Sequence, residues 1–160
     1  MGDLNCEVVS LSAHLDEEKI TRTIDDFDKA STNFSYVVKS LNYDIGFMID
    51  AGGEKIWAAT NEGRILDGNR FLVIVLKLFL MVTPKVKKIA VPVQATKEVE
   101  IVAEEYGIEV VRVKDTHYSM MRACDDKDVR FVAGTKGGFL FPNFLYATAV
   151  SYTHLRAHET

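Results

Sequence analysis

Three short loops carry the side chains of this sequence that could take part in chemistry. The first loop, residues 50–55, follows an apolar run and supplies two carboxylates, Asp50 and Glu54, with Gly52 between them. Ligands of α/β proteins usually gather at the carboxyl ends of buried strands, and Mg²⁺ prefers oxygen ligands. Two carboxylates are few for a magnesium site. The alternative interpretation is a solvated hairpin turn.

The second loop, residues 114–117, joins an expected strand to an expected helix. Lys114 carries a fixed positive charge, and His117 can donate a hydrogen bond or a proton near neutral pH. Thr116 stands where the helix should begin, so the three residues together could hold a phosphate oxygen. The alternative is a surface connection in which Thr116 only caps the helix.

The third loop, residues 134–138, has the sequence GTKGG. Its glycines would let backbone N–H groups approach an anion or a sugar closely. No phosphate-loop or dinucleotide fingerprint fits, because the lysine precedes the glycine pair and no helix clearly follows. A tight turn between two strands is the alternative.

Alternating strand and helix patterns must position these loops. Apolar residues recur at helical spacing between residues 25 and 41, and the run at residues 45–49 is typical of a strand buried on both faces. Asp67 can cap a helix that Thr83 and Pro84 end. We predict strands at residues 6–11, 45–49, 55–60, 88–93, 109–113, 129–133 and from 139, and helices at 25–41, 68–82, 96–107 and 116–124. This order predicts a layered α/β fold.

Composition excludes several classes of protein. The chain has 160 residues, of which 48% are hydrophobic, and a net charge of -4, so it lacks the basic surface that nucleic acid or an anionic membrane requires. Cys6 and Cys124 stand far apart, which argues against a zinc site or a disulfide framework and for reduced thiols. The longest apolar run, residues 71–82, is too short to cross a bilayer, and no signal-peptide pattern is visible. We expect a cytoplasmic protein.

The last residues, 150–160, resemble the translation of a sequencing adaptor and not a native sequence. We therefore exclude them from the fold and do not count His154 and His158 as a metal-binding pair. We expect the natural chain to continue beyond Ala149.

The order of the motifs resembles the α-D-phosphohexomutase family, which comprises phosphoglucomutases and phosphomannomutases. The matching segments, in chain order, are residues 44–50 (DIGFMID), 63–69 (GRILDGN), 91–93 (VPV), 104–107 (EEYG), 114–117 (KDTH) and 137–142 (GGFLFP). The resemblance implies two consecutive phosphohexomutase-type units, both truncated, each a mixed sheet flanked by helices. We place the second-domain-like unit at residues 1–83 and the third-domain-like unit at residues 84–149.

The resemblance also implies site residues. Asp50 and Glu54 fall on the family's magnesium loop, but Gly52 replaces its middle carboxylate and Glu54 its last Asp, so Mg²⁺ binding should be weak or lost. The family's sugar-motif Glu and Ser fall on Thr135 and Lys136, and the glycine of its phosphosugar segment is Thr116. The phosphosugar-binding residues implied by the resemblance are Lys55, Lys114, His117, Thr135, Lys136, Gly137 and Gly138.

The implied activity belongs to a larger protein. Family members are isomerases that transfer a phosphoryl group from a phosphoserine on a domain that this chain lacks. The chain alone should therefore not convert substrate to product. Its three altered loops resemble the mutase-like C-terminal region of bacterial mannose-1-phosphate guanylyltransferase-type proteins. That resemblance implies a non-catalytic module with a hexose phosphate or nucleotide-sugar ligand and with the missing domains of its own polypeptide as partners. The alternatives are a piece of an active phosphomannomutase or phosphoglucomutase, and an unrelated α/β binding domain.

Overall fold

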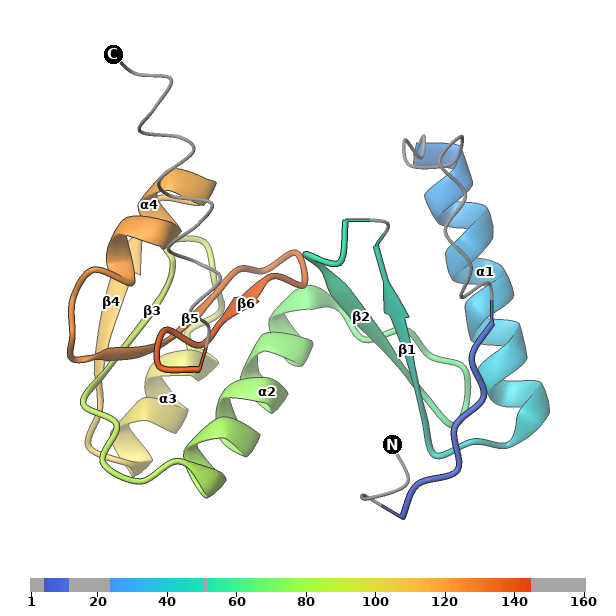
Figure 1. The fold of residues 1–160 in the computed structure, drawn as a ribbon, viewed down its shortest axis with the longest axis horizontal. Coiled ribbons are helices and arrows are strands. Elements are labelled where there is room, and N and C mark those ends of the chain that lie inside the picture. Colours follow the sequence, from blue (N-terminus) through green and yellow to red (C-terminus); the bar gives the residue numbers. More distant parts are fainter. Residues whose placement is uncertain (1–4, 12–23, 51, 145–160) are drawn as a thin grey trace.

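The computed structural model of the chain describes residues 5–11, 24–50 and 52–144, so the expectation for residues 150–160 lies outside the described residues. Within the described part, the strands form two sheets (Figure 1). One sheet has the two strands β1 and β2, and the other has four strands in the order β4-β3-β5-β6. Helices flank both sheets, which confirms the predicted α/β class.

The hairpin unit, residues 24–66, consists of α1 (Ile24–Leu41), β1 (Ile45–Ile49) and β2 (Ile56–Thr60). The two strands are antiparallel, with Phe47 opposite Ala58. Helix α1 covers one face of the hairpin, because Gly46 lies directly against Val38 and because the rings of Phe27 and Trp57 are 4.9 Å apart. The absence of a side chain at residue 46 therefore lets the helix approach the strand closely.

Two expectations for this unit are wrong. Strand β1 is not buried on both faces: Ile45, Phe47 and Ile49 are 50%, 52% and 59% exposed. Only the face toward α1 is covered in the described part of the chain, and an apolar run does not reveal that difference. In the described part of the chain, residues 6–11 form no strand and belong to neither sheet.

The four-stranded unit, residues 67–144, contains the remaining helices and strands. Strand β3 lies between β4 and β5 and is parallel to both, whereas β6 is antiparallel to β5. The elements are α2 (Gly68–Val82), β3 (Lys88–Pro92), α3 (Glu98–Glu105), β4 (Glu109–Val113), α4 (His117–Ala123), β5 (Val129–Ala133) and β6 (Phe139–Leu140). Helices α2 and α3 pack on one face of this sheet, and α4 packs on the other.

Helix α2 shares its core with the four-stranded sheet. Its buried residues Leu72, Leu76 and Phe79 belong to one hydrophobic cluster with Ile89 and Phe131. The ring of Phe79 lies 5.3 Å from that of Phe131. The division into residues 1–83 and 84–149 stays a prediction, but this packing favours a second unit that begins near Asp67.

The ends of α2 follow the sequence signals. The Asp67 carboxylate accepts hydrogen bonds from the N–H groups of Asn69 and Arg70, each at 3.1 Å, and Thr83 ends the helix. Although α2 is strongly apolar, no helix among the described residues, α2 included, is long and apolar enough to cross a bilayer.

Candidate functional site

Two of the three loops that the sequence singled out leave the four-stranded sheet at the same end of its strands. Strands β3, β4 and β5 are parallel, so the connections that follow them leave the sheet at the same side. Residues 114–117 follow β4 and residues 134–138 follow β5. The carboxyl ends of the strands are where open α/β sheets usually bind ligands.

Asp115 joins the second loop to its neighbours. Its carboxylate accepts a hydrogen bond from the amide of Gln94, in the connection after β3, and lies 3.9 Å from the Lys136 ammonium of the third loop. The side chain of Asp115 is 20% exposed and that of Lys136 is 79% exposed. The ion pair is therefore open to water and weak, and an anionic ligand could take over the lysine.

The third loop also touches the hairpin unit. The N–H of Ile56, the residue after the first loop, donates to the carbonyl of Gly137 at 2.9 Å. Gly137 has a φ of +84°, and a Cβ at this position would overlap the Ile56 carbonyl oxygen. Glycine is thus required here both for its backbone conformation and for the close approach of the two units.

The start of α2 is the last part of this junction, the region where the second and third loops, the connection after β3 and the hairpin unit contact one another. A Cβ at Gly68 would overlap the carbonyl oxygen of Thr135, so the helix begins directly against the third loop. The side-chain oxygen of Asn69 accepts the Thr96 N–H at 3.0 Å and ties α2 to the connection after β3. Sequence reasoning missed Gln94 and Asn69 as members of this junction, and it included Asp115 in the second loop without giving it a role. Their positions after β3, at the start of α2 and after β4 were the available signal.

Thr116 acts as a helix cap, as the alternative interpretation proposed. Its hydroxyl oxygen accepts the Ser119 N–H at 3.2 Å, at the start of α4. Lys114 and His117 flank this cap with exposed side chains, and the contacts that bind the loop to its neighbours involve Asp115. The structure therefore brings the loop to the site but leaves the side chains of Lys114 and His117 in solvent.

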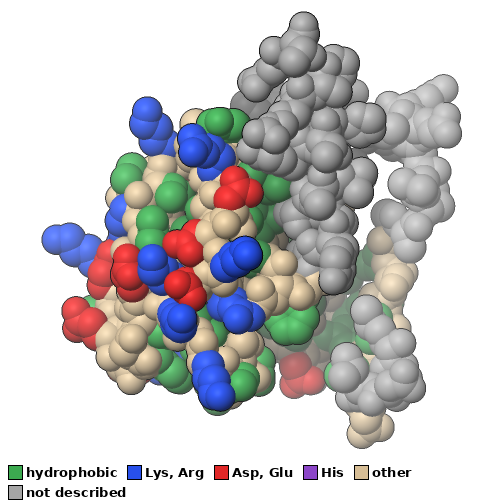
Figure 2. Space-filling model, turned by 60° about the vertical axis from the view of Figure 1, so that its left-hand side comes forward, with side chains coloured by type: hydrophobic (Ala, Val, Ile, Leu, Met, Phe, Trp, Pro, Cys, Tyr) green, Lys and Arg blue, Asp and Glu red, His purple; other side chains and the backbone are tan. Residues whose placement is uncertain are grey.

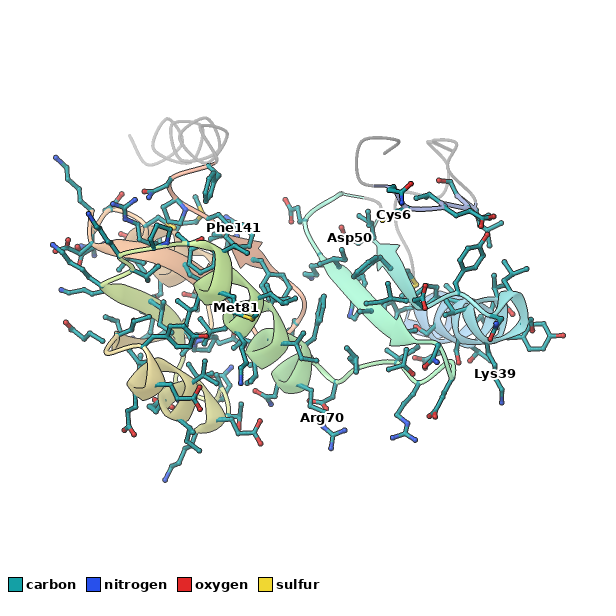
Figure 3. All side chains as sticks on the ribbon, turned by 90° about the horizontal axis from the view of Figure 1, so that it is seen from below. Cys6, Lys39, Asp50, Arg70, Met81 and Phe141 are labelled. Carbon is teal, nitrogen blue, oxygen red and sulfur yellow. The ribbon has the colours of Figure 1, made fainter. Side chains whose placement is uncertain are left out.

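The Asp50 loop is closed by hydrogen bonds of its own. One carboxylate oxygen of Asp50 accepts the N–H groups of Glu54, at 2.7 Å, and Lys55, at 3.0 Å, and the Asp50 carbonyl accepts the Gly53 N–H at 3.0 Å. Figure 3 shows Asp50 at the loop end of the β1–β2 hairpin. Among the described residues, no three His, Cys, Asp or Glu side chains are placed to share a metal ion. The residues present do not fit a magnesium ion, which needs several free oxygen ligands.

Replacing Gly52 by Asp should create metal binding at this loop. A Cβ at residue 52 would lie 3.9 Å from the second carboxylate oxygen of Asp50 and 3.7 Å from Cγ of Glu54, so the new carboxylate would stand between the two existing ones. We expect the Kd for Mg²⁺, measured by calorimetry, to fall by about tenfold or more. The neutral Gly52→Asn variant is the matched control, and equal binding by both variants would contradict this interpretation.

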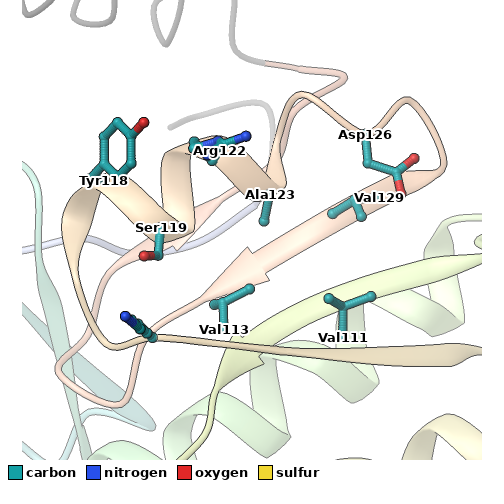
Figure 4. Close-up of a pocket in the computed structure, with 9 residues that line it drawn as sticks. Val111, Val113, Tyr118, Ser119, Arg122, Ala123, Asp126 and Val129 are labelled. Carbon is teal, nitrogen blue, oxygen red and sulfur yellow. The ribbon is translucent and has the colours of Figure 1, made fainter.

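An open surface groove of about 410 Å³ lies beside the edge strand β4 (Figure 4). Its floor is apolar and includes Val111 and Val113, and its rim includes Lys114 and Arg122, whose guanidinium lies 5.9 Å from the ring of Tyr118. Lys114 is the single predicted site residue among its lining residues. The groove therefore adjoins the second loop through Lys114.

Charge on the visible face of the four-stranded unit is mixed. Figure 2 shows basic and acidic side chains interspersed there, and two ion pairs join Lys87 to Asp128 at 2.9 Å and Lys88 to Asp126 at 3.3 Å. A surface of alternating sign gives no broad field to attract a polyanion.

Burial raises the pKa of the Cys124 thiol to about 11, with a smaller contribution from the charge of Asp125. We therefore expect this thiol to stay protonated and slow to react at neutral pH, because the thiolate is the nucleophile. In a Cys6→Ser variant, the rate of alkylation by iodoacetamide should still rise with pH above 10. A plateau below pH 9 would show that the thiol is not buried in this way.

The comparisons with known proteins agree with this fold. No family model matches the chain. It is 29% identical over 113 residues to phosphoglucosamine mutase of Methanococcus vannielii, covering 68% of this chain and 25% of that protein. It is 26% identical over 143 residues to a probable phosphoglucosamine mutase of Methanopyrus kandleri, and the match covers 89% of this chain and 31% of that protein. Against the phosphoglucomutase/phosphomannomutase of Thermococcus kodakarensis, it is 23% identical over 151 residues, covering 91% and 32%.

Solved structures show the same similarity. A phosphoglucomutase/phosphomannomutase family protein of Burkholderia thailandensis superposes with a TM-score of 0.75 at 21% identity, covering 91% of this chain and 32% of that one. A putative phosphomannomutase of Thermus thermophilus gives a TM-score of 0.66 at 13% identity, covering 74% and 27%. The chain thus spans about a quarter to a third of the proteins it matches. Its homologues and structural neighbours, at low identity, are proteins of the phosphoglucomutase/phosphomannomutase family, and the chain is a phosphohexomutase-like segment.

Proposed function

We propose that this chain is a non-catalytic phosphohexomutase-type module that binds a sugar phosphate or a related nucleotide sugar at the junction of its three loops. It would act in the cytoplasm as part of a longer polypeptide, of the kind in which a mutase-like region follows a mannose-1-phosphate guanylyltransferase. The observation that carries the proposal is the Asp50 carboxylate, which closes its own loop instead of standing free beside two other carboxylates.

The junction offers donors suited to a phosphorylated sugar. Lys55, Lys114 and Lys136 are exposed on the three loops. Gly138 has open space where a side chain would otherwise stand, so a ligand can approach the backbone there. Lys136 is already paired weakly with Asp115, so exchanging that partner for a phosphate would cost little.

Phosphoryl transfer requires more than such binding. The reaction depends on neutralising charge on the transferred group and on holding donor and acceptor in line. The first loop lacks the oxygen ligands for a cation, and the chain spans 25 to 32% of the mutases it matches. We therefore expect the chain alone to bind without turnover.

A second candidate function is a piece of an active phosphomannomutase or phosphoglucomutase. The observation that favours it is the similarity to mutases over 89 to 91% of this chain. In that case the cation would be held by donors outside residues 1–160, and activity would appear only when the rest of the polypeptide is present.

Titration of the ¹⁵N-labelled chain with glucose 1-phosphate, mannose 1-phosphate and inorganic phosphate tests the proposal. We expect saturable shifts confined to residues 52–55, 114–117 and 134–138, with a sugar-phosphate Kd on the order of 1 mM. Lys136→Ala should weaken binding, whereas Lys127→Ala, an exposed lysine between α4 and β5, should not. Absence of shifts would contradict the proposed binding. Formation of glucose 6-phosphate from glucose 1-phosphate by the longer polypeptide, with none formed by this chain alone, would favour the second candidate.

A further inference from the structure

Strand β4 is an edge strand of the four-stranded sheet, and among the described residues its ladder partner is β3. The N–H of Glu109 and the carbonyl of Val113 each form a hydrogen bond of 2.9 Å with a residue adjoining β3. A strand bonds to a parallel neighbour through every second residue, so Glu109, Val111 and Val113 face β3. The backbone N–H and C=O groups of Val110 and Arg112 therefore point toward the open side of the sheet.

The open groove beside β4 lies on the face of the sheet that carries α4. Figure 4 shows Val111 and Val113 along β4, with Ser119 and Ala123 of α4 across from them. The two valines are half-buried and stand two residues apart on one face. Alternate side chains of an added strand would lie beside them. The edge and the groove together offer what an extended peptide needs, which is backbone partners and an apolar surface for every second side chain.

The rim of the groove is basic. Lys114 and Arg122 line it, and within the described part of the chain neither side chain has an ion pair. Asp126 also lines the groove, but its carboxylate is already paired with the Lys88 ammonium at 3.3 Å. Charge complementarity therefore favours an acidic occupant.

We propose that a partner protein adds an extended acidic segment to the open edge of β4. The backbone of this segment bonds to the outward groups of Val110 and Arg112. Two of its side chains, at positions i and i+2, are apolar and cover Val111 and Val113. A carboxylate on the same face, at position i−2 or i+4, pairs with Arg122 on the rim.

Two observations select this partner over other occupants. Two copies related by a two-fold axis would pair their β4 strands with Val110 opposite Arg112, because these residues carry the outward groups. Val111 would then lie on the axis, and Arg122, which lines the groove with it, would meet Arg122 of the second copy. Small molecules usually bind in pockets that enclose most of their surface, whereas this groove is open.

A titration of the ¹⁵N-labelled chain with a synthetic peptide tests the proposal. The peptide is acetyl-Thr-Val-Thr-Val-Thr-Glu-amide, in which the valines and the glutamate share one face of a strand. At saturation we expect hydrogen exchange of the Val110 and Arg112 amides to slow by about tenfold or more, while that of the Val111 amide, which faces β3, changes less. Of two peptides N-methylated at the threonines or at the valines, one should lose binding and the other keep it, because every second residue bonds to β4.

Charge has its own controls. A peptide with Lys in place of Glu should bind about threefold or more weakly, and Arg122→Glu should weaken binding of the original peptide to a similar extent. Lys77→Glu makes the same charge change at an exposed position of α2, on the other face of the sheet, and should leave binding unchanged.

Absence of binding would overturn the proposal, and so would binding without protection of Val110 and Arg112, since a ligand held by the groove alone would explain it. A dimer of the chain alone with these two amides protected would also overturn it, because the occupant would then be a second copy. None of these outcomes depends on sugar-phosphate binding, because Val110, Arg112 and Arg122 lie outside the three loops. This test and that of the proposed function therefore fail separately.

Discussion

Replacing Arg112 by Met is expected to destabilise the four-stranded unit by about 3 kcal/mol. The guanidinium of Arg112, on β4, donates to both carboxylate oxygens of Glu100 on α3, at 2.8 and 2.6 Å. It also donates to the carbonyls of Pro92 and Ala95, each at 2.8 Å, and of Thr96 at 3.2 Å. One side chain thus satisfies the connection after β3 and pairs a carboxylate of α3.

The expected loss of unfolding free energy is large because water cannot solvate all the groups that Arg112 now hydrogen-bonds. The side chain of Arg112 is 24% exposed, and methionine would fill its space while leaving three carbonyls and a carboxylate without their donor. The expected free-energy change already allows for partial screening of the charges by solvent. Urea unfolding measures the change, and Arg122→Met on α4 is the control, because that exposed arginine has a cation–π contact with Tyr118 as its main interaction.

The same variant should disturb the candidate site. The connection after β3 carries Gln94, which donates to Asp115. If Arg112 positions that connection, the amide signals of Asp115 and Lys136 shift in Arg112→Met and stay in place in Arg122→Met. Equal stability of the two variants would show that water replaces the guanidinium at little cost.

Local signals predicted most of the elements. Helix α2 begins and ends where Asp67 and Thr83 placed it, because a cap and a proline act over one turn of chain. Strands β4 and β5 have the bounds that their apolar runs predicted. In each case the deciding interaction lies within a few residues.

The errors concern packing between distant segments. Helical periodicity shows that α2 has an apolar face, but not that Leu72 and Phe79 pack on the four-stranded sheet. The apolar run of β1 predicts a strand but does not say which faces are covered. Residues 6–11 have a strand composition, yet they belong to neither sheet of the described part, and composition alone does not determine strand pairing.

The candidate site was predictable as a set of loops and not as a set of contacts. Asp50 and Gly137 were singled out from residue type and position. Their actual partners, the amides of the Asp50 loop itself and the backbone of Ile56, follow from how the loops close and from how the hairpin unit meets the four-stranded unit. Thr116 was placed at a helix start, and the choice between cap and phosphate ligand needed its bond to Ser119.

Replacing Gly137 by Ala is expected to cost about 2–4 kcal/mol and to loosen the hairpin unit from the third loop. The backbone of Gly137 has a φ of +84°, which costs an L-residue about 1–2 kcal/mol. The added methyl group would also overlap the Ile56 carbonyl oxygen. Backbone cannot rotate away as a side chain can, so the two units must separate locally.

Alanine substitutions at two other glycines separate the cost of the backbone conformation from the cost of the steric overlap. Gly107 has a φ of +66° with open space around it, so Gly107→Ala should show the conformational cost alone. Gly138 also has open space and is not among the positive-φ glycines, so Gly138→Ala should change stability little. The excess of Gly137→Ala over Gly107→Ala in urea unfolding then measures the contact between the units. Faster exchange of the Ile56 amide should accompany that excess, and equal losses in the two variants would mean that the contact with Ile56 contributes nothing.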